Sequence, residues 1–143
     1  MDISTRIGAT GVQDSPLDTS SIADTVRSDA SGALVTFEGI VRNHDDGRSV
    51  TGIEYIAHPS ASEVVDEVAE DVAARHPECR VAVVHRVGKL DIGELALVAA
   101  VSSPHREASF AAVQDVVDTV KDKLPVWKRQ VFTDGSDEWV GSA

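Results

Sequence analysis

The chain has 143 residues, enough for one domain whose core needs no disulfide or structural metal, and too few for two ordinary domains. Apolar residues make up 42% and charged residues 26%, which is ordinary globular usage and excludes a disordered or fibrous chain. Lys plus Arg number 13 against 24 Asp plus Glu, and the formal charge of −11 argues against binding nucleic acid or an anionic membrane. A site for an anionic small molecule must therefore be built locally, by clustering the few cations.

The single cysteine, Cys79, excludes an internal disulfide and a multi-thiolate metal site. We interpret it as a passive, half-buried thiol beside Pro77. The sequence begins without the apolar core of a signal peptide, and the longest apolar run, residues 95–101, is too short to span a bilayer. We therefore expect a soluble protein of the reducing cytoplasm.

The first part of the chain divides into a lead-in and the start of the domain. Residues 1–16 are rich in Ser, Gly and Asp without an apolar period, which predicts a flexible lead-in or an edge strand. The domain is expected over residues 17–143. The spacing of Ile22 and Val26, between capping residues and the stop signal of Gly32, predicts a short helix.

Two runs of β-forming residues follow, at 33–41 and 50–56. The stretch between them contains an Asp-Gly turn signal. Together they predict a hairpin whose tip carries Arg42, His44 and Arg48.

The middle of the chain predicts a helix and two strands. Ser60 and Glu63 have the spacing of a capping box that opens a helix ended by Pro77. The inward face of that helix is predicted to carry Val64, Val65, Val68 and Val72. Residues 81–87 alternate as a strand, and residues 94–102 are almost continuously apolar, as in a strand covered on both faces.

The last third predicts an amphipathic helix over residues 105–123, stopped by Pro125. Its predicted apolar stripe is Phe110, Val113, Val117, Val120 and Leu124. A strand over 126–133, an Asp-Gly turn and a last short segment follow. Hairpin signals and crossovers occur together, so we expect an α+β single domain with a mixed, mainly antiparallel sheet and helices packed on it.

The first group of residues that could carry chemistry is a cluster of cations. Lys121, Lys123, Lys128 and Arg129 fall within nine residues of an otherwise acidic chain. Lys121 lies at the margin of the predicted stripe, so we expect it to be partly buried, with a pKa lowered by desolvation and neighbouring cations. Pro125 ends the helix and allows Lys128 to turn back toward Lys121. Alternatively, both lysines extend over the helix end and interact with its negative dipole.

The second group is SSPHRE, residues 102–107. Ser103 is suited to cap the helix and Pro104 to occupy its first position, which places His105 and Arg106 in the first turn. Positive side chains there interact unfavourably with the positive end of the helix dipole, and a bound anion would make the arrangement favourable. The segment is therefore a candidate phosphate site. Alternatively, both side chains point to solvent or pair with Glu107.

The third group is VRNHDDGR, residues 41–48, where Arg42 leaves the end of a strand; a plain polar hairpin explains it equally well. The five histidines have no tight ligand spacing with carboxylates or thiols, so we expect no metal site. His85 fits a structural histidine in a strand. Trp127 and Trp139 fit core or interface anchors.

These groups, in this order, resemble the molybdopterin synthase large-subunit family over residues 32–140. The motifs that carry the resemblance are GALVTFEGIVRNHDDG, HRVGKLDIGE, VSSPHREASF, and KDKLPVWKRQ followed by DGSDEWV. Each motif alone is weak, whereas the ordered set is specific.

The resemblance implies an activity and an assembly. The family is a sulfurtransferase that converts cyclic pyranopterin monophosphate to molybdopterin, taking two sulfurs from the thiocarboxylated C-terminus of a ubiquitin-like small subunit. It implies no cofactor, a hammerhead-like fold, and a homodimer at the centre of a heterotetramer with sites completed across the dimer. A catalyst that never carries the sulfur itself needs no reactive thiol, which agrees with the cysteine count.

The resemblance also implies site residues. Lys121 and Lys128 match the catalytic lysines, and we hypothesise that Lys121 is the general base or amine while Lys128 stabilises negative charge, with the reverse assignment left open. The remaining matches are substrate or phosphate contacts at Arg42, His105 and Arg106, and lining positions at Arg129, Gln130 and the backbone of Ile40 and Val41.

The sequence departs from the family pattern in two places. The segment IEYIAHPSA lacks the Tyr-Pro and acidic character common there. Other members carry a longer tail with a basic residue, whereas this sequence ends soon after Trp139; Arg48 is a candidate replacement for that cation.

Two alternative functions make different predictions from the family activity. A non-catalytic dimerisation or adaptor domain of the same fold predicts that the lysines are lost, yet both are present. An unrelated small phosphate-binding enzyme predicts turnover without a thiocarboxylated partner.

Overall fold

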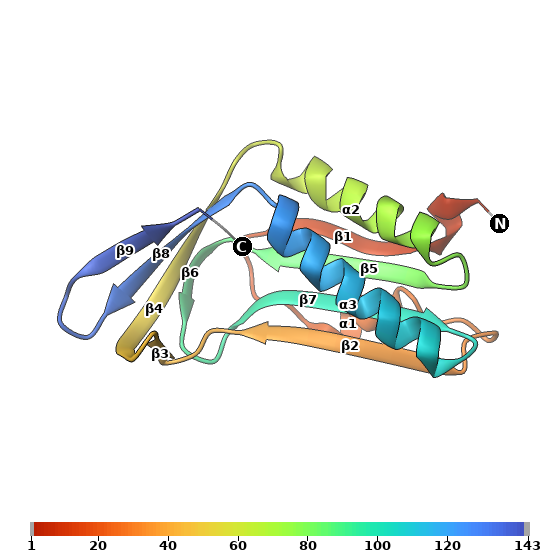
Figure 1. The fold of residues 1–143 in the computed structure, drawn as a ribbon, viewed down its shortest axis with the longest axis horizontal. Helices are drawn as coiled ribbons and strands as arrows, with labels where there is room; N and C mark the ends of the chain where they lie inside the picture. Colours follow the sequence, from red (N-terminus) through yellow and green to blue (C-terminus); the bar gives the residue numbers. More distant parts are fainter. Residues whose placement is uncertain (1, 142–143) are drawn as a thin grey trace.

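Two β-sheets and three α-helices organise the part of the chain that the computed structural model describes, residues 2–141 (Figure 1). In chain order the elements are η1 (Ile3–Arg6), β1 (Ile7–Gln13), α1 (Thr19–Asp24), β2 (Ala33–Ile40), β3 (His44–Asp45), β4 (Arg48–Ala57), α2 (Ala61–Arg75), β5 (Arg80–Arg86), β6 (Gly88–Asp91), β7 (Leu95–Ser103), α3 (Arg106–Lys123), β8 (Val126–Phe132) and β9 (Asp137–Val140). None of the helices in these residues is long and apolar enough to cross a membrane.

The first sheet has the strand order β1-β5-β7-β2. Its β1–β5 pair is parallel, and the β5–β7 and β2–β7 pairs are antiparallel. Helices α2 and α3 cover one face (Figure 1), and α1 contacts β7, β2 and β5 from the other face. The predicted α+β class with a mixed, mainly antiparallel sheet is therefore confirmed.

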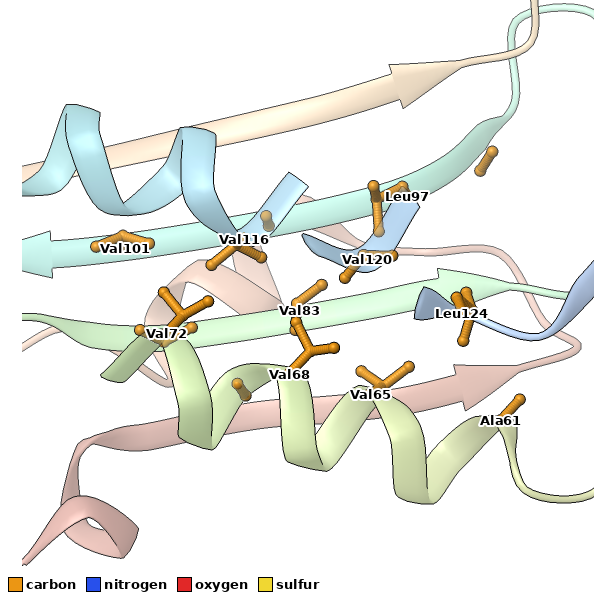
Figure 2. Packing of buried hydrophobic residues seen from close by; sticks show 14 of the residues in the cluster. Ala61, Val65, Val68, Val72, Val83, Leu97, Val101, Val116, Val120 and Leu124 are labelled. Carbon is orange, nitrogen blue, oxygen red and sulfur yellow. The ribbon is translucent and has the colours of Figure 1, made fainter. Parts of the chain in front are cut away.

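The main core lies between α2, α3 and the first sheet (Figure 2). Small and β-branched side chains from the two helices and the central strands interdigitate there; those labelled in the view include Val65, Val68, Val72, Val83, Val101, Val116 and Val120. Strand β7 is buried from its second residue onward because helices cover both of its faces. The continuous apolar run over 94–102 predicted this burial correctly.

The second sheet has the order β3-β4-β8-β9, with β6 also paired to β4. The hairpin predicted from residues 33–41 and 50–56 is wrong, because β2 pairs with β7 and β4 pairs with β8. The Asp-Gly turn exists, with positive φ at Asp46 and Gly47, but it joins β4 only to the two-residue strand β3. The two runs therefore belong to different sheets, and the loop between them crosses from one sheet to the other.

Both long helices begin differently from the prediction. Ser60 precedes α2 but makes no side-chain cap; its hydroxyl lies 2.8 Å from Nδ1 of His58 instead. Helix α3 begins at Arg106 rather than at the proline, with His105 in the N-cap position. The hydroxyl of Ser103 donates to the carbonyl of His105 at 2.7 Å, which holds the preceding turn outside the helix.

The buried stripe of α3 is rotated from its predicted position. Phe110 is 58% exposed, and the fully buried positions are Ser109, Ala112, Val116 and Val120. Small residues at the first two of these positions let the helix approach the sheet closely, which leaves Phe110 outside. Trp127 and Trp139 are also exposed, so neither is a core residue of this chain.

Residues 7–13, for which the sequence allowed a lead-in or an edge strand, form the edge strand β1. Arg6 precedes this strand and is itself buried. Its Nη1 donates to the carbonyls of Ala73, His76 and Cys79, at 3.0, 3.3 and 2.8 Å. The N-terminal segment thus ties down the carbonyl groups at the end of α2 and in the turn after it.

Candidate active site

A cavity of about 270 Å³ lies where the two sheets meet, beside the C-terminal end of α3. Its walls come from the end of β2, the loop through β3, the inner face of β4, the end of β5, the start of β7, the last turn of α3 and β8. The lining residues are Gly39, Ile40, Val41, Arg42, His44, Asp45, Val50, Ile53, Tyr55, His85, Ala96, Leu97, Lys121, Lys128 and Gln130.

Three cations from separate parts of the sequence reach this cavity: Arg42, Lys121 and Lys128. Arg42 lies in the loop after β2, Lys121 in the last turn of α3, and Lys128 on β8 after the chain has turned at Pro125. The predicted return of Lys128 toward Lys121 is therefore what the fold produces. The predicted partial burial of Lys121 is wrong, because its side chain is exposed at the mouth of the cavity.

Lys128 is the more buried of the two lysines. Burial lowers its pKa below the usual value, and the positive charges of Lys121 and Arg42 lower it further, while the carboxylate of Asp45 acts in the opposite direction. Desolvation and neighbouring positive charges, which the sequence predicted would lower the pKa of Lys121, therefore act on Lys128 instead. The reason is that Lys128 lies on the inner face of β8.

Asp45 adds a carboxylate among the cations. Its Oδ1 lies 3.1 Å from Nη2 of Arg42, in a pair that is largely exposed on the arginine side. A hydrogen bond from the amide of Gln130 lowers the pKa of Asp45, and the charges of Lys128 and Arg42 contribute to the same shift. Asp45 therefore remains ionised and holds Arg42 in place.

The inner part of the cavity is apolar and aromatic. The ring of Tyr55 meets the ring of His85 edge to face, with centroids 4.9 Å apart and an interplanar angle of 82°. Nδ1 of His85 lies 2.6 Å from the carbonyl of Arg86. Burial lowers the pKa of His85 to about 4, so the ring is neutral at physiological pH.

The backbone of Val41 is already engaged within the protein. Its N–H donates to the carbonyl of Glu94 at 2.9 Å, and its carbonyl accepts from Gly93 at 2.8 Å. Val41 therefore lines the cavity through its buried side chain rather than through free backbone groups. Ile40 lies at the exposed rim.

Other residues predicted for the site lie elsewhere in the chain. Arg129 points to the opposite face of β8 from Lys128, as strand alternation requires, and binds Asp137 at 2.7 Å. His105 and Arg106 lie at the far end of α3, beside a separate open cavity. Lys121 lies fifteen positions after Arg106 in α3, a rise of about 22 Å along the helix axis.

Arg48, the candidate replacement for a tail cation, does not line the cavity. Its guanidinium stacks on the ring of Phe132 at 3.5 Å and donates to the hydroxyl of Ser136 at 2.7 Å. It therefore joins β4 to the turn before β9.

The thiol of Cys79 and the possible metal-ligating side chains of residues 2–141 were also located in the structure. The thiol of Cys79 is fully buried rather than half-buried, donates to the carbonyl of Ala108 at 3.5 Å, and has a pKa raised mainly by burial. Within residues 2–141 there is no group of three or more His, Cys, Asp or Glu side chains placed to hold a metal ion.

Sequence reasoning missed the contributions of Asp45, Tyr55 and His85 to the cavity. The sequence indicates only a polar hairpin for the segment that contains Asp45, and only a structural histidine at position 85. A polar ring within the buried strand of residues 81–87 was the available signal, because buried polar groups need a partner or a function.

Comparison with known proteins places these observations in a family. The family model described as MoaE protein matches residues 12–123. Proteins named molybdopterin synthase catalytic subunit are 38% identical in Nostoc, with 87% of this chain and 77% of the relative covered, and 35% identical in Bacillus subtilis, with 88% and 80% covered.

Solved structures agree with these relatives. The structure titled molybdopterin synthase from Staphylococcus aureus has a TM-score of 0.87 at 28% identity, covering 92% of this chain and 96% of its own. A Helicobacter pylori structure, titled as a complex of subunits 1 and 2 of molybdopterin-converting factor, shares the fold with a TM-score of 0.69 at 16% identity, covering 94% of this chain and 90% of its own. The chain therefore belongs to the MoaE protein family.

Proposed function

We propose that this protein is the catalytic subunit of a molybdopterin synthase, converting cyclic pyranopterin monophosphate to molybdopterin. The observation that carries the proposal is the convergence of Arg42, Lys121 and Lys128 on one cavity in a chain whose net charge is −11. The chain repels anions overall, but these three cations beside the single carboxylate of Asp45 make the cavity locally positive, as a phosphorylated substrate requires.

The sulfur donor in this proposal is the thiocarboxylated C-terminus of a ubiquitin-like small subunit. The chain's one cysteine is buried and its pKa is raised, so it is a poor sulfur carrier. A donated sulfur must therefore enter the cavity from outside. A cytoplasmic location, expected from the sequence, is part of the proposal.

The two lysines have different surroundings, which favours different roles. Lys128 is half-buried with a lowered pKa, so it is the better candidate for a neutral amine that takes a proton or engages the substrate. Lys121, exposed at the mouth of the cavity, is the better candidate for the cation that stabilises negative charge on the thiocarboxylate or the phosphate. This assignment reverses the one favoured by the sequence.

The remote position of His105 and Arg106 leads to a proposal about assembly. A homodimer within a heterotetramer would complete each site if the α3 N-terminus of one copy reached the cavity of its partner. Both side chains are exposed in the single chain and lie beside their own open cavity, where a substrate phosphate has room.

The first test measures product formation from purified chain, precursor and thiocarboxylated small subunit. We expect Lys121→Ala and Lys128→Ala each to lower turnover by about 100-fold or more, the usual range for lost acid–base or electrostatic groups. Lys123→Ala is the matched control, because Lys123 is on the same helix end but outside the cavity, near Asp71. Full activity in either cavity variant would contradict the proposal.

The second test asks whether sites are shared between copies. Lys128→Ala and Arg106→Ala chains are unfolded together, refolded as mixed dimers and assayed. If each site takes Lys128 from one copy and Arg106 from the other, random mixing leaves roughly a quarter of the sites intact. If both residues act within one chain, or if Arg106 has no role, this partial recovery from two inactive variants will not occur.

A further inference from the structure

The ion pair between Arg86 and Glu94 lies outside the cavity, although His85, beside it in the sequence, is part of the cavity wall. Arg86 is the last residue of β5, and strand alternation directs its side chain to the face of the first sheet that α1 covers. The side chain is only 9% exposed. Its Nη1 donates to Oε1 of Glu94 at 3.3 Å, whereas its Nε has no hydrogen-bond partner within residues 2–141.

Glu94 ends the turn of residues 91–94, which joins β6 to β7 and is called the β6–β7 turn below. Its backbone N–H donates to the carbonyl of Asp91 at 3.1 Å, and its Oε2 accepts from the backbone N–H of Asp91 at 2.6 Å. That N–H and then Arg86 lower the pKa of Glu94, although burial acts in the opposite direction. The ionised carboxylate therefore closes the turn with one oxygen and accepts from Arg86 with the other.

The β6–β7 turn also holds the backbone of the loop that carries Arg42. Strand β2 ends one residue before Val41, whose N–H donates to the carbonyl of Glu94 at 2.9 Å and whose carbonyl accepts from Gly93 at 2.8 Å. Arg42 follows directly and lines the cavity. The turn is thus the anchor on the N-terminal side of Arg42, and the hairpin of β3 and β4 is the anchor on its other side.

Stability alone does not account for a buried ion pair at this place. Withdrawing a guanidinium and a carboxylate from water costs free energy that their attraction offsets only in part, and an apolar pair of similar volume is often as stable. The unpartnered Nε of Arg86 adds to that cost. The pair supplies direction, which apolar contacts do not, because a charged hydrogen bond fixes the carboxylate of Glu94 relative to the end of β5.

We propose that Arg86 and Glu94 are positioning residues, which hold the β6–β7 turn against Val41 and thereby fix Arg42 at the cavity. Neither member of the pair lines the cavity, so the pair acts on a ligand only through Arg42. The contacts run from the end of β5, through the turn, to the loop after β2, and so join three segments that are separate in the sequence. The effect on turnover rests on the proposed function above, whereas the effect on Val41 does not.

Two variants break the ion pair with little change of size. Arg86→Met keeps the length of the side chain and removes the guanidinium. Glu94→Gln keeps the size of the carboxylate, but its single side-chain oxygen cannot accept from both Asp91 and Arg86, as the two carboxylate oxygens do. Arg75→Met is the matched control, because it breaks an ion pair with Asp115 between α2 and α3, away from the turn and the cavity.

Amide hydrogen exchange in the full chain tests the structural part of the proposal without substrate. Amides in the centre of β7 report global unfolding, and the Val41 amide reports release of the loop from the turn. In Arg86→Met and Glu94→Gln, we expect exchange at Val41 to rise by about 10-fold more than exchange in the centre of β7. In Arg75→Met, both should change by the same factor.

A double-mutant cycle with Arg42→Ala tests the functional part, using the precursor and the thiocarboxylated small subunit. We expect Arg86→Met to raise KM for the precursor by roughly 10-fold with little change in kcat, because Arg42 holds the anionic substrate. In the Arg42→Ala background the same change should have almost no further effect. A merely structural role would change KM by the same factor in both backgrounds. Arg86→Lys should recover part of the loss, because its ammonium can still donate to Glu94.

The outcomes separate the two proposals. If the wild type neither binds nor converts the precursor, the proposed function fails, and exchange at Val41 alone decides the positioning proposal. If the wild type is active, the positioning proposal is overturned by either of two results in folded Arg86→Met: exchange at Val41 that rises no more than exchange in β7, or a KM effect that persists in the Arg42→Ala background. Should Arg86→Met not fold, Glu94→Gln replaces it in both measurements with the same expectations.

Discussion

A carboxylate on α3 joins the two long helices and allows a quantitative test of the structure. Asp115 accepts from Nε and Nη2 of Arg75 at 2.9 and 3.0 Å, and from the hydroxyl of Thr119 at 3.0 Å. Its Oδ2 also lies 2.8 Å from Nε2 of His76. The change Asp115→Asn keeps the size of the side chain but removes the charge on which these partners depend.

The magnitude follows from the lowered pKa of Asp115. The hydrogen bonds from Arg75, and then those from His76 and Thr119, lower this pKa from 3.8 to about 2, although partial burial opposes the change. A tenfold difference in proton affinity is worth about 1.4 kcal/mol, so the ionised carboxylate stabilises the fold by roughly 2 kcal/mol. The side chain is 25% exposed, so solvent screening reduces this figure only moderately.

The pH dependence has a definite sign. The unfolded chain binds the proton more tightly than the folded one, so the stabilisation is fully present above about pH 5. It is lost as the pH falls through 3.8 toward 2, and roughly half remains at pH 3. The deficit of Asp115→Asn relative to wild type should therefore shrink by about half between pH 7 and pH 3.

Urea unfolding of both proteins at pH 7, 5, 4 and 3 measures this difference. Asp118→Asn is the matched control, because Asp118 is an exposed carboxylate on the same helix. We expect the control to unfold like the wild type at every pH. A deficit for Asp115→Asn that is the same at pH 3 as at pH 7, or that is absent at pH 7, would refute the reasoning.

Three further predictions concern single side chains. Arg6→Met should lower the free energy of unfolding by roughly 2 to 4 kcal/mol, because three carbonyls at the end of α2 lose their shared donor; urea unfolding with little change would contradict the tie. Lys128→Met should raise the thermal midpoint, because burial disfavours the charged amine in the folded state, and should abolish turnover, because the reaction needs the neutral amine; a lower midpoint would count against the assigned burial. Cys79 should react with a thiol reagent only as fast as the chain unfolds; rapid labelling of the native protein would show that the thiol is accessible.

Several features could be predicted from the sequence because they depend on neighbouring residues. The periods of two and 3.6 residues located most of the strands and the two long helices, and Pro125 and the Asp-Gly pairs marked turns that the structure contains. The clustering of Lys121 and Lys128 was also a local signal, since both lie within one helix end and the strand that follows it.

Pairing between distant segments could not be predicted in the same way. The hairpin of residues 33–41 and 50–56 failed because an Asp-Gly signal specifies a turn but not how far the strands on either side remain paired. Phe110 was placed inside because its spacing fits the stripe, whereas the sheet accepts Ser109 and Ala112. Strand pairing and the choice of the buried face of a helix both depend on which partner surface buries the most apolar area. That surface is built from residues far away in the sequence.

The candidate site shows the same division. Composition and residue spacing determined that a cluster of cations must exist in this acidic chain, and motif order determined the family. Only the tertiary structure decided that Arg42 joins the lysines, that Lys128 rather than Lys121 is the more buried, and that His85 and Gln130 line the same cavity. The physical reason is that burial, pKa and hydrogen-bond satisfaction are properties of the surroundings of a side chain, and three or more separate segments supply those surroundings here.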